Sequence, residues 1–343
     1  FVLEVDGECD GVLIGKTTDK AEISRGSEKV SLCALLDDYE NKLEKVYSCN
    51  IPSDKNEVIK NFEYKTTKVF AAKESFAKPR VLIPVFPGTN CEYDTAKAIR
   101  AAGAEPEIFV IRNLTSKAIA DSVEEFAKKI DSSQIIFIPG GFSGGDEPDG
   151  SGKFITAFFR NAEIRDKVSN LLENRDGLMA GICNGFQALI KLGLVPFGKI
   201  IDTDDTCPTL TFNKISRHQS RLVRTKVVSN NSPWLMEVGV GDVITVPISH
   251  GEGRFLASEE TIASLEANGQ IITQYVDLSG TPTNDIRFNP NGSAHAIEGI
   301  ISADGRVLGK MGHSERVGEG LYKNVPGNYD MGLFKSAVKY YSL

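Results

Sequence analysis

One cysteine in this sequence stands in a setting that suits a nucleophile. The run GICNG at 181–185 follows the short apolar stretch 178–182 and precedes a helical pattern over 184–193. Glycines two residues before and after a cysteine let the chain turn sharply between a strand and a helix, so that the side chain projects there. The helix dipole behind the turn stabilises a thiolate. The pattern predicts a nucleophile at Cys183, although a structural cysteine at the end of a buried strand would leave the same residues.

A thiol nucleophile needs a base, and the base needs an orienting group. His250 precedes Glu252 by two residues, and His313 precedes Glu315 by the same spacing. Residues two apart in an extended segment point the same way, so each pair could act as one unit. The residues by themselves leave the two pairs as equal candidates.

A glycine-rich loop offers donors for a developing negative charge. The segment 139–152 contains six glycines but lacks the Lys-Ser/Thr ending of a phosphate-binding loop. A backbone N–H at Gly140 or Gly141, together with the N–H of Asn184 after the nucleophile, could hold an oxyanion. Without a nucleophile nearby, this loop would be interpreted as an ordinary surface loop.

These loops sit between regularly alternating strand and helix patterns. The predicted strands are 80–86, 107–111, 135–141 and 178–182, and the predicted helices between and after them are 91–103, 116–130, 152–172 and 184–193. Such alternation predicts an α/β fold with a doubly wound, mainly parallel sheet. Ligands of such sheets bind beyond the carboxyl ends of the strands, where the loops 87–90 and 139–152 and the turn at Cys183 all lie. Four later strand patterns within 222–320 are expected to extend the sheet or cover it.

Composition narrows the class of protein further. The 343 residues carry 39 Lys and Arg against 46 Asp and Glu, a formal charge of −7, which disfavours a general nucleic-acid binder. No uninterrupted apolar run approaches the length of a membrane-spanning helix. The six cysteines show no paired spacing, so a reduced, cytoplasmic protein is expected, and no cluster of metal ligands is apparent.

The first part of the chain differs from the rest. Residues 1–48 contain short strand patterns and a helical pattern over 33–48, which predicts a small α+β piece. Residues 49–78 are polar and rich in lysine, so a linker is expected there, with the main domain over 79–343. The sequence begins with Phe rather than Met and reads like the middle of a strand, so we expect a fragment of a longer chain.

Five motifs together resemble one known family. They are FPGTNCEYD at 86–94, PGGFSGGD at 139–146, GICNGFQAL at 181–189, SHGEGRF at 249–255 and HSERV at 313–317. In this order they are similar to the glutaminase part of phosphoribosylformylglycinamidine synthase, a class I glutamine amidotransferase of flavodoxin-like fold. Residues 1–48 resemble the tail of the synthase domain in the large, single-chain form of that enzyme.

The resemblance implies a set of roles. Cys183, His313 and Glu315 match the catalytic triad, which selects the later of the two His-x-Glu pairs. The remaining matched positions are the oxyanion residues Gly141 and Asn184, and the glutamine-binding candidates Gln187, Asn213, Ser216, Arg217 and His250. The chain departs from the family pattern at Ser314, where proline is usual, and at Gly144, where tyrosine is common.

The resemblance also implies partners. The substrate would be glutamine, and the synthase domain would receive the ammonia and bind Mg-ATP, so no cofactor is expected on this chain. Two other classes stay open: a different thiol hydrolase on the same fold, and a non-catalytic interaction domain of amidotransferase shape. A non-catalytic domain is disfavoured because Cys183, Gln187, His313 and Glu315 are all intact. The other thiol hydrolase usually has a histidine directly after the cysteine, and Asn184 at this position disfavours it.

Overall fold

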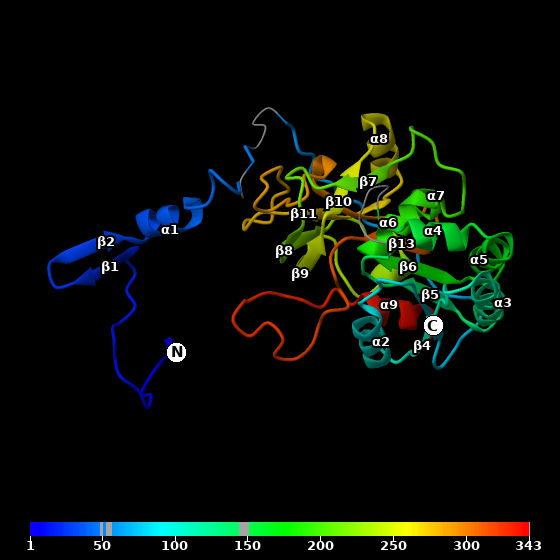
Figure 1. Ribbon diagram of the computed structural model, residues 1–343, viewed down its shortest axis with the longest axis horizontal. Coiled ribbons are helices and arrows are strands. Elements are labelled where there is room, and N and C mark those ends of the chain that lie inside the picture. Colours follow the sequence, from blue (N-terminus) through cyan, green and yellow to red (C-terminus); the bar gives the residue numbers. More distant parts are fainter. Residues whose placement is uncertain (49–50, 53–56, 144–150, 343) are drawn as a thin grey trace. The chain divides into compact units, whose positions relative to one another are not determined.

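The computed structural model describes residues 1–48, 51–52, 57–143 and 151–342. The chain divides into two compact units, Phe1–Ile51 and Pro52–Leu343. Each unit is described by itself (Figure 1).

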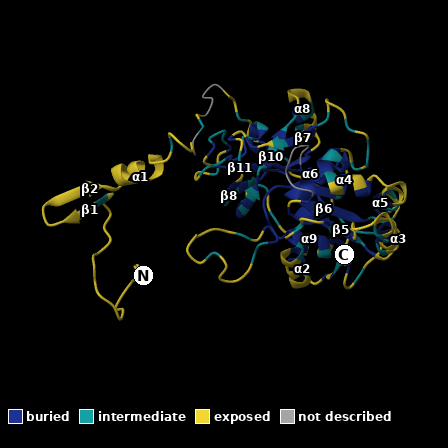
Figure 2. Cartoon of the chain, in the orientation of Figure 1, coloured by how far each residue is buried: buried dark blue, intermediate teal, exposed yellow. Residues whose placement is uncertain are grey.

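Unit 1 is a hairpin followed by one helix. Strands β1 (Glu22–Arg25) and β2 (Glu28–Ser31) pair antiparallel, and α1 (Leu32–Asn41) follows directly. Ser31 caps this helix by accepting a hydrogen bond from the Ala34 N–H at 3.4 Å. The helix ends well before the predicted residue 48, and no described residue of unit 1 is buried (Figure 2). A helix this short gains little stability without a packed face, which accounts for its early end.

Unit 2 is built on a sheet of nine strands in the order β4-β3-β5-β6-β13-β12-β11-β8-β9. In chain order its strands are β3 (Arg80–Val85), β4 (Glu105–Val110), β5 (Ile135–Ile138), β6 (Leu178–Ile182), β8 (Gln219–Val227), β9 (Val243–His250), β11 (Ile271–Tyr275), β12 (Ile297–Ile301) and β13 (Val307–Lys310). The first five strands in this order, β4, β3, β5, β6 and β13, pair parallel with their neighbours. The pairings from β13 through β12, β11 and β8 to β9 are antiparallel. The predicted α/β class is confirmed, and the late strands extend the sheet.

Helices supply the layers around this sheet. They are α2 (Glu92–Ala101), α3 (Ser116–Ser132), α4 (Lys153–Phe159), α5 (Ala162–Asn174), α6 (Asn184–Lys191), α7 (Leu194–Phe197), α8 (Glu259–Ala267) and α9 (Leu333–Tyr340), with short 3₁₀ turns η1 (Pro233–Leu235) and η2 (Ala294–Ala296). A separate two-stranded sheet pairs β7 (Thr209–Phe212) with β10 (Glu252–Leu256).

Both faces of the parallel half are covered, as a doubly wound sheet requires. On one face, Ile99 of α2 and Phe334 of α9 line the same small cavity as Val81 of β3. On the other face, Phe126 of α3 packs against Phe109 of β4, with ring centroids 5.6 Å apart. Successive residues of a strand point to opposite faces, so Val81 and Pro84 of β3 face opposite sides of the sheet. Phe109 of β4 is in register with Pro84 and therefore lies on the face opposite Val81. Strands β5 and β6 of this half are buried along their whole length (Figure 2).

The structure differs from the predicted helix over 152–172. Two helices, α4 and α5, occupy this interval, and the break falls at Arg160 and Asn161. The side chain of Asn161 accepts a hydrogen bond from the Glu163 N–H at 3.0 Å. Asparagine is a preferred N-cap residue, so it starts a new helix there.

The segment expected to be a linker lies partly outside the described residues. From residue 57 to 78 it contains no helix and no named strand, yet Phe62 is buried in the hydrophobic core of unit 2. The Tyr64 N–H donates to the carbonyl of Val228 at 2.7 Å, which ties the segment to the end of β8. Among the described residues, no helix is both long and apolar enough to cross a lipid bilayer.

Candidate active site

Cys183 is the single residue between the end of β6 and the start of α6. Its backbone has φ 53° and ψ −106°, a conformation that costs strain in any residue with a side chain. The thiol is 4% exposed, and its Sγ lies 3.6 Å from the carbonyl of Ser249 on β9. The tight turn predicted from the GICNG pattern is thus present, and strain of this kind is typical of a nucleophile turn.

The flanking glycines are required by close approach. A Cβ on Gly185 would lie 2.1 Å from the carbonyl oxygen of Ile138, and one on Gly181 would lie 2.5 Å from the backbone of Gly185. Both distances are far inside van der Waals contact. The turn therefore packs directly against β5 and α6 only because neither residue carries a side chain.

This packing gives a first prediction. We expect Gly185→Ala to lower the free energy of unfolding by about 1–3 kcal/mol, because the added methyl group must displace the backbone of β5. Gly318→Ala is the matched control, since a Cβ there would meet no atom within 4 Å. Urea denaturation of both variants measures the difference. Equal unfolding midpoints would contradict the close approach.

The loop after β5 lies against this turn. The N–H and the hydroxyl of Ser143 both donate to the Asn184 side-chain oxygen, at 3.2 and 2.6 Å. Gly141 has φ 153°, and a Cβ there would lie 2.6 Å from Thr89. Within the described part of the chain, no hydrogen bond from the Gly141 N–H is found, and Asn184 opens α6, where backbone N–H groups lack intrahelical partners. The predicted donor pair thus lies on two connected segments. Gly144 and the rest of the loop to 150 lie outside the described residues.

His313 reaches Cys183 through the pairing of two parallel strands. Lys310 at the end of β13 is in register with Ile182, and its carbonyl accepts the Cys183 N–H at 2.9 Å. His313 follows three residues later, and its N–H donates to the Pro247 carbonyl at 2.9 Å. The sheet therefore brings a histidine distant in sequence to the nucleophile turn.

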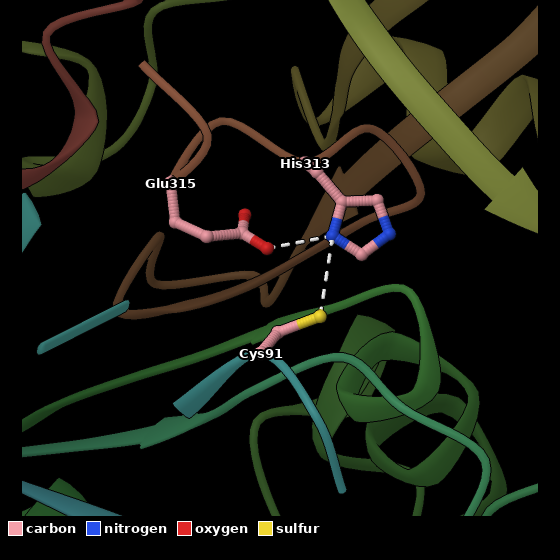
Figure 3. Close-up of side chains that lie close together, drawn as sticks. All are labelled: Cys91, His313 and Glu315. Atoms are coloured by element: carbon pink, nitrogen blue, oxygen red, sulfur yellow. Dashed lines mark hydrogen bonds and ion pairs between the residues drawn. The ribbon is translucent and has the colours of Figure 1, made fainter. Parts of the chain in front are cut away.

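His313 and Glu315 form a buried pair. Nδ1 of His313 lies 2.6 Å from Oε1 of Glu315, and both residues are 2% exposed (Figure 3). Burial lowers the pKa of His313, but the Glu315 charge and the nearby Cys183 and Cys91 thiols outweigh it and raise that pKa well above its usual range. Burial raises the pKa of Glu315, whereas the charge and hydrogen bond of His313 lower it below its usual value. The pair is therefore an imidazolium with a carboxylate.

The other ring nitrogen of His313 is left for chemistry. Among the described residues, Nε2 has no hydrogen-bond partner of its own. Because Nδ1 is occupied by Glu315, Nε2 is the atom that can exchange a proton at the nucleophile.

The other His-x-Glu pair is arranged differently. His250 ends β9 and is 1% exposed, and neither of its ring nitrogens has a hydrogen-bond partner in the described residues. Glu252 instead accepts the Ser151 N–H at 2.9 Å and lies 3.9 Å from Lys191 Nζ. Burial, with smaller contributions from the neighbouring His313 and His218, lowers the pKa of His250 to about 3. His250 is therefore a neutral ring with no carboxylate to orient it.

This environment gives a second prediction. The pKa of His250 falls from about 6.5 in the unfolded chain to about 3 in the folded chain, so the unfolded state binds more protons between these values. The resulting stability is present above pH 6.5 and is lost as pH falls toward 3. We expect His250→Gln to flatten the loss of unfolding free energy between pH 6.5 and 4.5. Denaturant titrations at several pH values measure this, and parallel curves for wild type and variant would contradict it.

Gln187 and Asn213, two of the predicted glutamine-binding residues, form hydrogen bonds between the segments that surround the site. Gln187 donates to the carbonyl of Glu252 at 2.5 Å and accepts from the Asn184 amide at 2.9 Å. Asn213 donates to the carbonyls of Arg217 and His250, at 3.0 and 2.8 Å. These bonds connect α6 and the segment after β7 to the 250–253 turn.

Two further predicted residues lie on the outer side of that segment. Ser216 is exposed and has φ 62°, and Arg217 is half-buried. Both follow Asn213 in the connection between β7 and β8. Their side chains are accessible from solvent, in contrast to the buried amides of Gln187 and Asn213.

Cys91 is a residue of the site that the sequence analysis missed. Its Sγ lies 3.9 Å from His313 Nδ1, on the same ring nitrogen as Glu315 (Figure 3), and it accepts from Arg316 Nη2 at 3.2 Å. One ligand atom from each of Cys91, His313 and Glu315 lies within 4.8 Å of the others, a donor set of the kind zinc uses. Cys91 belongs to the 86–94 motif, so membership of that motif is the sequence signal that points to it.

Gly140 completes this corner of the site. A Cβ there would lie 2.7 Å from Cε1 of His313 and 3.1 Å from the Cys91 sulfur. The absent side chain lets the His313 ring lie close to the loop after β5. The site thus gathers residues from the ends of β3, β5, β6, β9 and β13, the edge where ligands of such sheets bind.

Comparison with known proteins agrees with this architecture. A family model described as a CobB/CobQ-like glutamine amidotransferase domain matches residues 78–341, so the chain belongs to this glutamine amidotransferase family. The subunit PurQ of phosphoribosylformylglycinamidine synthase from Methanococcus maripaludis strain C7 is 37% identical over 239 residues, covering 69% of this chain and 82% of that protein. PurQ from Salinibacter ruber is 32% identical over 261 residues, covering 76% and 96%. Within the family the chain belongs to the PurQ group.

A solved structure supports the same assignment. The structure of PurLQS from Thermotoga maritima contains a chain that matches with a TM-score of 0.56 and 27% identity. The match covers 77% of this chain and 99% of that one. The nine-stranded mixed sheet is therefore that of a glutamine amidotransferase.

Proposed function

We propose that this chain is the glutaminase part of a phosphoribosylformylglycinamidine synthase, which hydrolyses glutamine and delivers ammonia for purine biosynthesis. The observation that carries the proposal is the buried His313–Glu315 pair beside the strained Cys183 turn. Membership of the PurQ group supplies the substrate and the acceptor reaction.

The proposed reaction proceeds through a thioester. The Cys183 thiolate attacks the side-chain amide carbon of glutamine, and the N–H groups of Gly141 and Asn184 hold the resulting oxyanion. The His313 imidazolium gives its proton to the amide nitrogen, the carbon–nitrogen bond breaks, and ammonia leaves. Neutral His313, oriented by Glu315, then takes a proton from water. The hydroxide attacks the thioester, glutamate leaves, and the thiolate–imidazolium pair is restored.

The proposed substrate contacts follow the roles that the family resemblance implies. Because the Gln187 and Asn213 amides already bond to the protein, we propose that they shape the glutamine pocket and offer their remaining valences to the substrate. Ser216 and Arg217, which are accessible, would bind the α-amino and α-carboxylate groups. His250, a neutral ring, would line the pocket wall.

The ammonia acceptor is proposed to be a synthase domain of the same enzyme. PurQ is part of the PurLQS assembly in the related structure. The family match starts at residue 78, and α1 of unit 1 exposes apolar side chains such as Leu35 and Leu36, as a piece of a larger domain would. We propose that residues 1–48 are the tail of the synthase domain in a large single-chain form, that 49–78 link it to the glutaminase domain over 79–343, and that Mg-ATP binds to the synthase domain.

Labelling with a diazoketone analogue of glutamine tests the glutaminase assignment. We expect the reagent to modify Cys183 alone, and excess glutamine to protect it. Peptide mass analysis locates the label, and a coupled assay measures glutamate release in parallel. Protein that is neither labelled at Cys183 nor active toward glutamine would contradict the proposal and favour a non-catalytic interaction domain.

A further inference from the structure

A buried ion pair lies directly beneath the catalytic loop. Nζ of Lys310, at the end of β13, is 3.2 Å from Oε1 of Glu298 on β12, and their side chains are 1% and 0% exposed. Taking two charges out of water costs several kcal/mol, and a well-packed apolar pair often gives equal or greater stability. Stability alone is therefore a weak reason for this pair.

The pair contacts the residues on either side of His313. Lys310 Nζ donates to the carbonyl of Gly312 and to the hydroxyl of Ser314, both at 3.0 Å. Oε1 of Glu298 accepts the Gly312 N–H at 2.6 Å. The backbone before His313 and the side chain after it are thus both fixed to the same two buried charges.

The second carboxylate oxygen anchors the pair to the sheet. Oε2 of Glu298 accepts a hydrogen bond from the Thr273 hydroxyl on β11 at 2.5 Å. Three neighbouring strands, β11, β12 and β13, therefore contribute to one network that ends at the loop. Such a network of satisfied buried groups specifies one conformation of the segment it holds.

Ser314 connects this network to the departure from the family pattern. A proline at this position would restrict the loop through its fixed φ. Serine lacks that restriction, but its hydroxyl accepts the bond from Lys310. The hydrogen bond between Lys310 and Ser314 thus restricts the loop at the position where a proline ring would otherwise do so.

We propose that Lys310 and Glu298 are positioning residues, which hold His313 and Glu315 in reacting geometry at Cys183 through Gly312 and Ser314. The inference rests on the proposed glutaminase function. Neither residue touches the reacting atoms, so their effect is on the placement of His313.

The test replaces the charges together, because removing one would leave the other buried and unpaired. In Lys310→Met/Glu298→Gln the side-chain shapes stay similar, and glutamine can still accept the Gly312 N–H. The matched control is Arg306→Met/Asp304→Asn, which removes an ion pair of 2.8 Å beside the opposite end of β13. We expect the first double variant to lower kcat for glutamine hydrolysis about 10²-fold, with KM changed less than about threefold, because misplacing a catalytic group costs on this order.

Rescue separates positioning from general damage. Adding Ser314→Pro to Lys310→Met/Glu298→Gln should restore at least about half of the lost kcat on a logarithmic scale, although proline also removes the hydrogen bond from the Ser314 N–H to the Gly312 carbonyl. Circular dichroism and thermal unfolding monitor the fold in each variant. Equal kcat in the Lys310 and Arg306 double variants, or a loss that Ser314→Pro does not reduce, would overturn the proposal.

A second readout does not depend on activity. The proton between His313 Nδ1 and Glu315 should give a downfield proton resonance in wild type, identified by its loss in His313→Gln. We expect Lys310→Met/Glu298→Gln to shift or broaden it, and the added Ser314→Pro to restore it. An unchanged resonance in the double variant would overturn the positioning role even if wild type released no glutamate, in which case the glutaminase function would have failed separately.

Discussion

Replacing Cys183 with alanine should abolish glutamine hydrolysis and leave the fold intact. We expect kcat to fall by roughly 10⁴-fold or more, because the thioester cannot form and only residual oxyanion stabilisation remains. The diazoketone label should disappear completely. Steady-state glutamate release and intact mass measure both effects.

Cys91→Ala is the matched control for this prediction. Cys91 is also a buried thiol next to His313. Its Sγ lies 3.9 Å from Nδ1 of the ring, the nitrogen that is hydrogen-bonded to Glu315. Both cysteines are N-cap residues, Cys183 of α6 and Cys91 of α2, but of the two only Cys183 has a positive φ, 53° against −108°. We expect Cys91→Ala to keep the label at Cys183. If the label instead moved to Cys91, or was lost in Cys91→Ala, the nucleophile would be Cys91 and not Cys183.

Replacing the two candidate bases should give different kinetic results. We expect His313→Ala to lower kcat by about 10²–10⁴-fold, because in the proposed mechanism Nε2 protonates the departing amide nitrogen and then activates water. His250→Ala should act mainly on KM, because this ring is neutral, has no hydrogen-bond partner among the described residues and is proposed to line the glutamine pocket. Parallel measurements of kcat and KM across the glutamine concentration range separate the two.

The outcome for His250 is the more decisive of the two. A fall in kcat in His250→Ala as large as that in His313→Ala, with KM unchanged, would assign the base to the earlier pair. Glu315→Gln provides a further check, because it keeps the shape of the orienting group but removes its charge. We expect Glu315→Gln to lower kcat and to lower the pKa of His313 toward its usual value.

The nucleophile turn was determined by the local sequence. The apolar strand 178–182, the glycines two residues on either side of Cys183, and the helix that follows all lie within a few residues of one another. Strand–helix alternation in the same way determined the parallel half of the sheet. Local geometry of this kind depends on backbone sterics and side-chain periodicity, which a single sequence records directly.

Only the tertiary structure shows that the two His-x-Glu pairs are arranged differently. Both have the same spacing, but Glu315 turns to Nδ1 of His313, whereas Glu252 turns to Ser151 and leaves His250 alone. The Cys91 contact and the Lys310–Glu298 pair likewise join strands that are distant in the sequence. Pairings of this kind follow from strand order and register, since parallel pairing of β13 with β6 places His313 at Cys183. The sequence contains the residues of the site, and the order of strands in the sheet decides which of them meet.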